Sequence, residues 1–109
     1  MSHRVIFHID ELEKWPITLN NASNMTDYAS EDVIVLVNGP AIEGLRRTSE
    51  VSERIQAILT KEVKVKACLV SLANKGISQA DLLDGVETVP SGVVYLSDQQ
   101  HHGASYIKP

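Results

Sequence analysis

Residues 63–72, VKVKACLVSL, predict a short β-strand that runs into a turn and carries the only cysteine of the chain at its end. The strand alternates between two faces, with Val63, Val65 and Ala67 on one face and Lys64, Lys66 and Cys68 on the other. Neighbours on one face of a strand lie roughly 7 Å apart, so Lys66 is close enough to favour the thiolate form of Cys68. The rest of the chain is expected to position this sulfur atom.

Length and composition predict a soluble globular protein. The chain has 109 residues, enough for one domain over residues 1–109, and hydrophobic residues make up 43% of it. The formal net charge is −4 and the basic residues are scattered, so a nucleic-acid surface is not expected. No repeat, low-complexity segment or Gly/Ser linker indicates a domain boundary.

The same features predict a cytoplasmic protein. No apolar run approaches the roughly 20 residues that cross a bilayer, and the N-terminus lacks the hydrophobic core of a signal peptide. A single cysteine cannot form an internal disulfide, and a reducing compartment keeps it as a thiol.

Strands and helices are expected to alternate along the chain. The expected strands cover residues 5–9, 33–37, 63–68, 86–89 and 105–107. A helix that begins at Trp15-Pro16 should bury Trp15, Leu19, Ala22, Thr26 and Ala29; a second, capped by Ser49, should bury Val51, Ile55, Ile58 and Leu59. Alternation of this kind predicts an α/β fold, a three-layer sandwich around a mostly parallel sheet of about five strands.

Ligands of open parallel sheets collect at the carboxyl ends of the strands. Four segments fall there: Asp10-Glu11, Asn38-Gly39-Pro40, Cys68 to Ser71, and Pro90-Ser91-Gly92. Three of them lead directly into expected helix N-termini, which can hold an anion. A helix N-terminus also lowers the pKa of a thiol, so Cys68 is the leading candidate for chemistry.

Three other polar residues have two possible interpretations each, and motifs for metal, nucleotide and hydrolase sites are absent. His8 is either a core imidazole or a catalytic group, and Asn21 and Asn24 are either solvated or bind a loop, a ligand or another subunit. Metal binding is not expected, because ligands at paired spacing and a second cysteine are absent. The absence of Walker-type and GxGxxG loops, and of a nucleophile elbow at Ser91-Gly92, argues against a nucleotide cofactor and a serine hydrolase.

An ordered set of short segments runs through nearly the whole chain. They are VIFHIDE at 5–11, KWP at 14–16, LNN at 19–21, VNGP at 37–40, VKAC at 65–68, GIS at 76–78, VPSGVV at 89–94 and YIKP at 106–109. On these segments the chain resembles the DsrE/DsrF-like family, which includes sulfur-relay subunits of the DsrEFH and TusBCD type. It is most similar to the stand-alone, uncharacterised members.

The resemblance implies a flavodoxin-like sheet of about five strands and assembly as homotrimers or homohexamers. It also implies that Cys68 receives sulfane sulfur as a persulfide from a donor protein and passes it to an acceptor. Residues that could support it or bind a ligand are His8, Asp10, Asn21, Asn38, Gly39, Lys66, Ser71, Ser91 and Gly92. The sequence departs from related members at Val70, where they usually have an asparagine, while Ser71 and Leu72 remain.

Two functions are therefore considered. The first is an intracellular sulfur carrier or transferase that uses Cys68 as its nucleophile. The second is a non-catalytic oligomeric module that binds a small anionic ligand or a partner protein at the strand carboxyl ends, with Cys68 as a packing residue.

Overall fold

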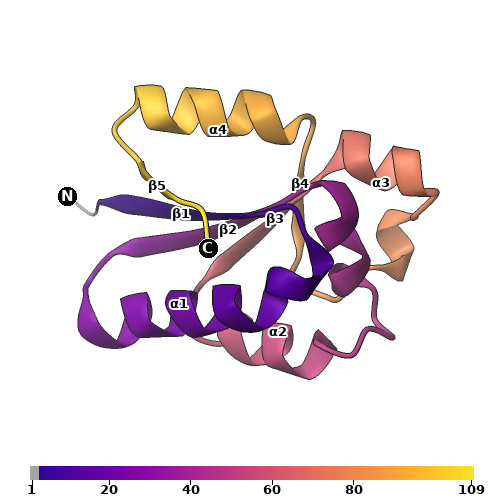
Figure 1. Cartoon of the computed structure of the whole chain (residues 1–109), viewed down its shortest axis with the longest axis horizontal. Helices are drawn as coiled ribbons and strands as arrows, with labels where there is room; N and C mark the ends of the chain where they lie inside the picture. Colours follow the sequence, from indigo (N-terminus) through magenta and orange to yellow (C-terminus); the bar gives the residue numbers. More distant parts are fainter. Residues whose placement is uncertain (1–2) are drawn as a thin grey trace.

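The computed structural model describes residues 3–109 and contains one five-stranded sheet (Figure 1). The strands are β1 (Arg4–Ile9), β2 (Asp32–Val37), β3 (Lys64–Cys68), β4 (Glu87–Val89) and β5 (Ser105–Ile107). They lie in the order β4-β3-β2-β1-β5, and every neighbouring pair is parallel. The carboxyl ends of all five strands therefore meet at one edge, as the alternating pattern predicted.

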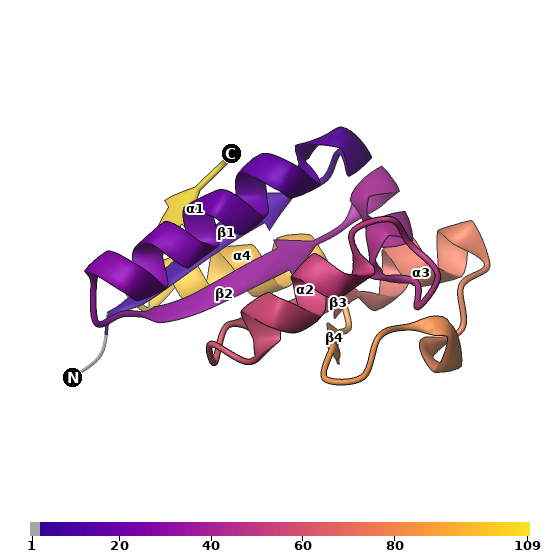
Figure 2. The same ribbon diagram turned by 90° about the horizontal axis from the view of Figure 1, so that it is seen from below.

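Helices cover both faces of the sheet and make the expected three layers. The α-helices are α1 (Trp15–Tyr28), α2 (Ser52–Leu59), α3 (Leu69–Lys75) and α4 (Gly92–His101), and the 3-10 helices are η1 (Leu12–Lys14), η2 (Gly39–Leu45) and η3 (Gln79–Asp81). In Figure 1, α1 and α2 lie below the sheet and α4 lies above it. Figure 2 shows α1 and α2 running beside each other under the sheet.

The two faces of the sheet bury unequal cores. Val5, Phe7 and Ile9 of β1 join a large hydrophobic cluster with α1 and α2. On the other face Ile6 and Leu96 belong to a cluster that has only five buried members. The alternation of side chains along each strand thus sends the cysteine of β3 to the thinly covered face, under α4.

Two details of the helices differ from the sequence-based expectation. Trp15, Leu19 and Ala22 are buried in α1 as predicted. Thr26 is only half-buried and Ala29 is exposed, because the chain leaves the helix at Tyr28 and becomes extended. The prediction of these two as core residues was wrong.

The sequence suggested that Ser49 is the N-cap of α2, but the N-cap residue is Val51. The hydroxyl of Ser49 donates instead to the carbonyl of Gly44, 2.6 Å away. Backbone turns joining Arg46 to Ser49 and Ser49 to Ser52 delay the start of α2 until Ser52. Ile55 and Ile58 are buried in α2 as expected, and Val51 and Leu59 are half-buried against the same cluster.

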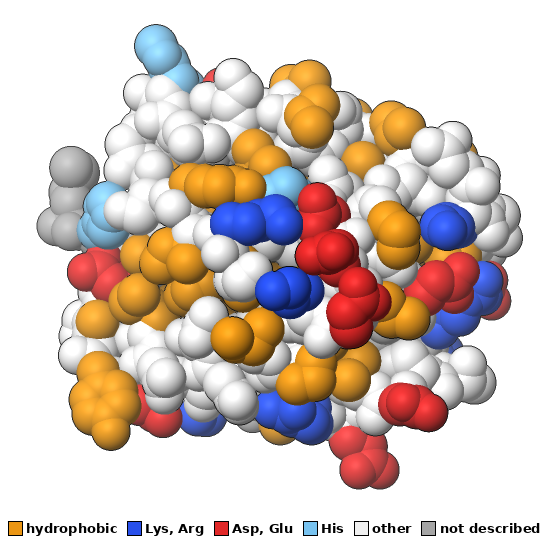
Figure 3. All heavy atoms as spheres, viewed as in Figure 1, with side chains coloured by type: hydrophobic (Ala, Val, Ile, Leu, Met, Phe, Trp, Pro, Cys, Tyr) orange, Lys and Arg blue, Asp and Glu red, His pale blue; other side chains and the backbone are white. Residues whose placement is uncertain are grey.

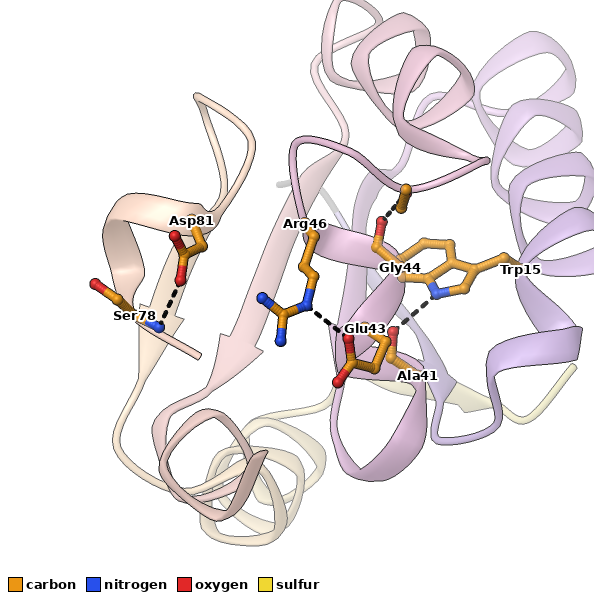
Figure 4. Close-up of polar contacts among 8 residues, drawn as sticks. Trp15, Ala41, Glu43, Gly44, Arg46, Ser78 and Asp81 are labelled. Atoms are coloured by element: carbon orange, nitrogen blue, oxygen red, sulfur yellow. Dashed lines mark hydrogen bonds and ion pairs between the residues drawn. The ribbon is translucent and has the colours of Figure 1, made fainter. Parts of the chain in front are cut away.

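A glycine and a capping box form the connections after α3. Gly76 ends α3 in the left-handed conformation, with a φ of 67°. Ser78 and Asp81 then form a capping box around η3, in which the Ser78 N–H donates to the Asp81 carboxylate (Figure 4). Within residues 3–109 no helix is long and apolar enough to span a membrane.

Candidate functional site

Cys68 lies where β3 ends and α3 begins, and it is the N-cap residue of α3. The backbone N–H of Gly92, the first residue of α4, donates to Cys68 Sγ at 3.2 Å. The cysteine is only 4% exposed. The sulfur is therefore held between the starts of two helices, at the carboxyl edge of the sheet.

Hydrogen bonds make Cys68 more acidic than an ordinary thiol. Burial, the largest single effect, raises the pKa of Cys68 because it disfavours the charged thiolate. Hydrogen bonds from the backbone and hydroxyl of Ser71 and from the backbone of Gly92 and Val70 together outweigh burial, so the pKa is lowered. Backbone donors thus stabilise the thiolate, and Val70 contributes through its amide although its side chain has no polar group.

Lys66 lies on the face that the sequence predicted, but it is paired with a carboxylate. It lies on the same face of β3 as Cys68, but its ammonium group is 3.0 Å from a carboxylate oxygen of Glu87 on β4. The two residues are direct partners in the β3–β4 register. The lowered pKa of the thiol comes from the hydrogen bonds of Ser71, Gly92 and Val70 rather than from this lysine.

His8 is part of a hydrogen-bonded chain that crosses three strands. Its Nδ1 lies 2.6 Å from the hydroxyl of Tyr106 on β5, and its Nε2 lies 2.8 Å from Oδ1 of Asn38 at the end of β2. His8 is 9% exposed, so the ring is almost enclosed and both of its nitrogens are satisfied. Of the two interpretations of His8, the structure supports the core imidazole. This imidazole also makes a hydrogen bond with Asn38, a candidate site residue.

The turn after β2 is hydrogen-bonded to the first turn of α3. Gly39 has a φ of 57°, and its N–H donates to the hydroxyl oxygen of Ser71 at 2.9 Å. A Cβ on Gly39 would lie 3.2 Å from the carbonyl oxygen of Asp10, which already accepts the N–H of Ala41 at 3.2 Å. Glycine is therefore required there both for its backbone conformation and for the close approach.

The carboxylate of Asp10 is used in an ion pair. Its Oδ1 lies 2.9 Å from Nζ of Lys108, near the end of the described chain. The hydrogen bond from Lys108 is the main cause that holds the pKa of Asp10 below its usual value. Acidic and basic side chains lie next to each other near the centre of the face shown in Figure 3.

The structure brings most of the candidate residues together at one edge of the sheet. His8, Asn38, Gly39, Ser71 and Gly92 connect directly or through one another to the surroundings of Cys68. Ser91 is the N-cap residue of α4, although its side chain makes no capping hydrogen bond.

Asn21 does not join this group. It lies on α1, across the sheet from Cys68, where it lines a shallow depression with Asn24 and Tyr28. Tyr106 was missed as a site residue, although the YIKP segment was noted in the sequence. Only the pairing of β5 with β1 shows that it lies beside His8.

A metal centre has no support in the part of the chain that the structure describes. No group of three or more His, Cys, Asp or Glu side chains there could hold a metal ion. His101 and His102 lie at the exposed end of α4, with their rings edge-on.

Comparison with known proteins places the chain in a family. The DsrE/DsrF-like family matches residues 6–109. A comparison with curated proteins found no match. Among solved structures, the protein of unknown function MTH1491 from Methanobacterium thermoautotrophicum is 34% identical, with a TM-score of 0.93 over 99% of this chain and 100% of that one.

Two further solved structures share the fold at lower identity. The ychN protein from E. coli is 18% identical, with a TM-score of 0.80 over 100% of both chains. The conserved protein of unknown function BT1422 from Bacteroides thetaiotaomicron is 13% identical, with a TM-score of 0.80 over 97% of this chain and 94% of that one. The match over residues 6–109 shows that this chain belongs to the DsrE/DsrF-like family, which is associated with sulfur relay and whose members often act in complexes.

Proposed function

We propose that the protein is a sulfur carrier of the cytoplasm that holds sulfane sulfur as a persulfide on Cys68. The observation that carries this proposal is the set of hydrogen bonds from Gly92, Ser71 and Val70 that lowers the pKa of the thiol. The thiolate is the nucleophile of sulfur exchange, so a thiol with a lowered pKa is suited to this role.

The transfer steps need no other reactant than the donor and the acceptor. The Cys68 thiolate attacks the outer sulfur of a donor persulfide, R–S–SH, and forms a new S–S bond. The S–S bond of the donor breaks, and R–S⁻ leaves with the electron pair while the proton stays on the transferred sulfur. An acceptor thiolate then attacks that outer sulfur and releases the Cys68 thiolate.

A test of this function measures the mass of the intact protein after incubation with a small persulfide such as glutathione persulfide. We expect the native protein to gain one sulfur atom and to lose it to an added thiol, because sulfur bound as a persulfide is exchangeable. Cys68→Ser should gain none, since no other cysteine is present. Absence of added sulfur on the folded native protein would contradict the proposal.

A second candidate function is favoured by the 4% exposure of Cys68. A thiol so enclosed could serve only as a packing residue in a module that binds an anionic ligand or partner protein. In that case iodoacetamide should alkylate the folded protein slowly at every pH between about 6 and 9, the range in which an ordinary thiol titrates. Fast alkylation that increases with the thiolate fraction would support the sulfur carrier instead.

We also propose that the protein is a homotrimer or homohexamer. Exposed apolar side chains support this: Val93 and Val94 on α4 are 66% and 64% exposed, and Val70 beside the cysteine is 53% exposed. Burial of these side chains against a second copy would stabilise an assembly. Light scattering coupled to size-exclusion chromatography measures the mass, and a monomer at micromolar concentration would contradict the proposal.

A further inference from the structure

The hydrogen-bonded chain from Tyr106 to Asn38 has a direction. Asn38 Oδ1 can only accept, so the His8 Nε2 that lies 2.8 Å from it carries the proton. A neutral His8 then accepts at Nδ1, and the hydroxyl of Tyr106, 2.6 Å away, is the donor. In this arrangement the Tyr106 hydroxyl donates to the His8 tautomer that carries its proton on Nε2, and the NH2 end of the Asn38 amide points away from the ring.

The free end of that amide and the cysteine both border Gly92. A Cβ built on Gly92 would lie 3.4 Å from Asn38 Nδ2 and 3.4 Å from Cys68 Cβ, so both residues border the same side of Gly92. Asn38 Nδ2 makes no hydrogen bond with another residue of the described chain, although it has two N–H donors. Two unused N–H donors therefore lie near Gly92, the residue whose own N–H donates to the thiol.

We propose that the Asn38 side chain donates a hydrogen bond to the sulfur that Cys68 carries, and that His8 and Tyr106 are positioning residues that hold its NH2 group in that orientation. The inference rests on the proposed function and gives Asn38 a role in it. It also gives His8 a role in the site without making it an acid or a base.

A persulfide needs such a donor. Once the Cys68 persulfide has lost the proton of its outer sulfur to solvent, the negative charge lies on that outer atom, while the N–H of Gly92 remains directed at Sγ. The outer sulfur then requires a donor of its own, because a charge in a largely buried site is costly when it makes no hydrogen bond. The Asn38 NH2 group is a donor that borders the same side of Gly92 as Cys68.

Asn38→Asp tests the proposal, because it keeps the shape and the acceptor for His8 but replaces the NH2 group by a second oxygen. We expect the fraction of protein that retains a persulfide to fall about tenfold, since a donor to an anion is lost and a like charge is added. The pH midpoint of iodoacetamide alkylation should also move upward. Asn24→Asp is the matched control, since it makes the same charge change at an exposed site on α1 and should leave both quantities unchanged.

Tyr106→Phe provides a second variant, in case Asn38→Asp does not fold. Tyr106 is 39% exposed, so the loss of its hydroxyl should be tolerated. Without that hydroxyl, the His8 tautomer protonated at Nε2 loses its hydrogen bond at Nδ1, so the orientation of the Asn38 amide is held less strictly. We expect a shift of the alkylation profile in the same direction as in Asn38→Asp, and a role of Tyr106 in packing alone would not move it.

The outcomes separate this inference from the proposed function. If the native protein takes up sulfur and Asn38→Asp retains it equally well, the role of Asn38 is wrong and the carrier function stands. If the native protein takes up no sulfur, both are wrong. A loss of persulfide in Asn38→Asp and Tyr106→Phe, but not in Asn24→Asp, supports both.

Discussion

Gly44→Ala is expected to destabilise the protein by about 3 kcal/mol, at the upper end of the usual cost of overpacking a core. A Cβ on Gly44 would lie 2.2 Å from Nε1 of Trp15 and 2.7 Å from its Cδ1. Trp15 has no exposed surface, and its Nε1 donates to the carbonyl of Ala41 at 2.9 Å (Figure 4). The indole must therefore move, and its buried N–H loses its acceptor.

The measurement is thermal unfolding followed by tryptophan fluorescence, which reports on this site because Trp15 is the only tryptophan. We expect the Tm to fall by about 10 °C. Gly76→Ala is the matched control: its φ is 67° but no atom lies within 4 Å of the added Cβ. Its cost should be about 1 kcal/mol, from backbone strain alone.

A double-mutant cycle identifies the contact. In a Trp15→Phe background the smaller ring leaves room for the added methyl group, so Gly44→Ala should cost less there than in the native protein. Equal costs in the two backgrounds would show that the contact between residues 15 and 44 is not the cause.

The strands could be predicted from the sequence because their patterns depend on local rules. Residues 33–37 are apolar throughout, as expected for a strand covered on both sides, and residues 63–68 alternate. The start of α2 could not be predicted, because Ser49 is an ordinary capping residue. In the structure its hydroxyl donates to the carbonyl of Gly44 instead, and this contact depends on the path of η2.

Part of the site could also be predicted from local patterns, because these patterns locate the ends of the strands. In a parallel sheet the carboxyl ends of the strands meet, so the sequence alone was enough to expect Asn38, Cys68 and Gly92 at one edge. The partner of Lys66 depends on the β3–β4 register, which places Glu87 opposite it. The role of Tyr106 depends on β5 pairing with β1, and no local pattern encodes that pairing.

Ser71→Ala is expected to slow alkylation of Cys68 about tenfold at neutral pH, through a smaller thiolate fraction. The Ser71 hydroxyl is one of the groups that lower the pKa of the thiol, and its oxygen also accepts the N–H of Gly39 at 2.9 Å. The backbone N–H of Ser71 remains, so the effect should be partial. Ser97→Ala on the exposed surface of α4 is the control and should alkylate at the native rate.

The same change should alter how stability depends on pH. Because the pKa of Cys68 is lower in the folded state, its thiolate stabilises the fold fully above the unfolded-state pKa of about 8.5. This contribution is lost as the pH falls through the lower folded-state value. The difference in the free energy of unfolding between the native protein and Cys68→Ser should thus increase with pH. In the Ser71→Ala background the same difference should increase less. A difference that stays constant with pH in urea unfolding would mean that the hydrogen bonds around Cys68 do not favour its thiolate.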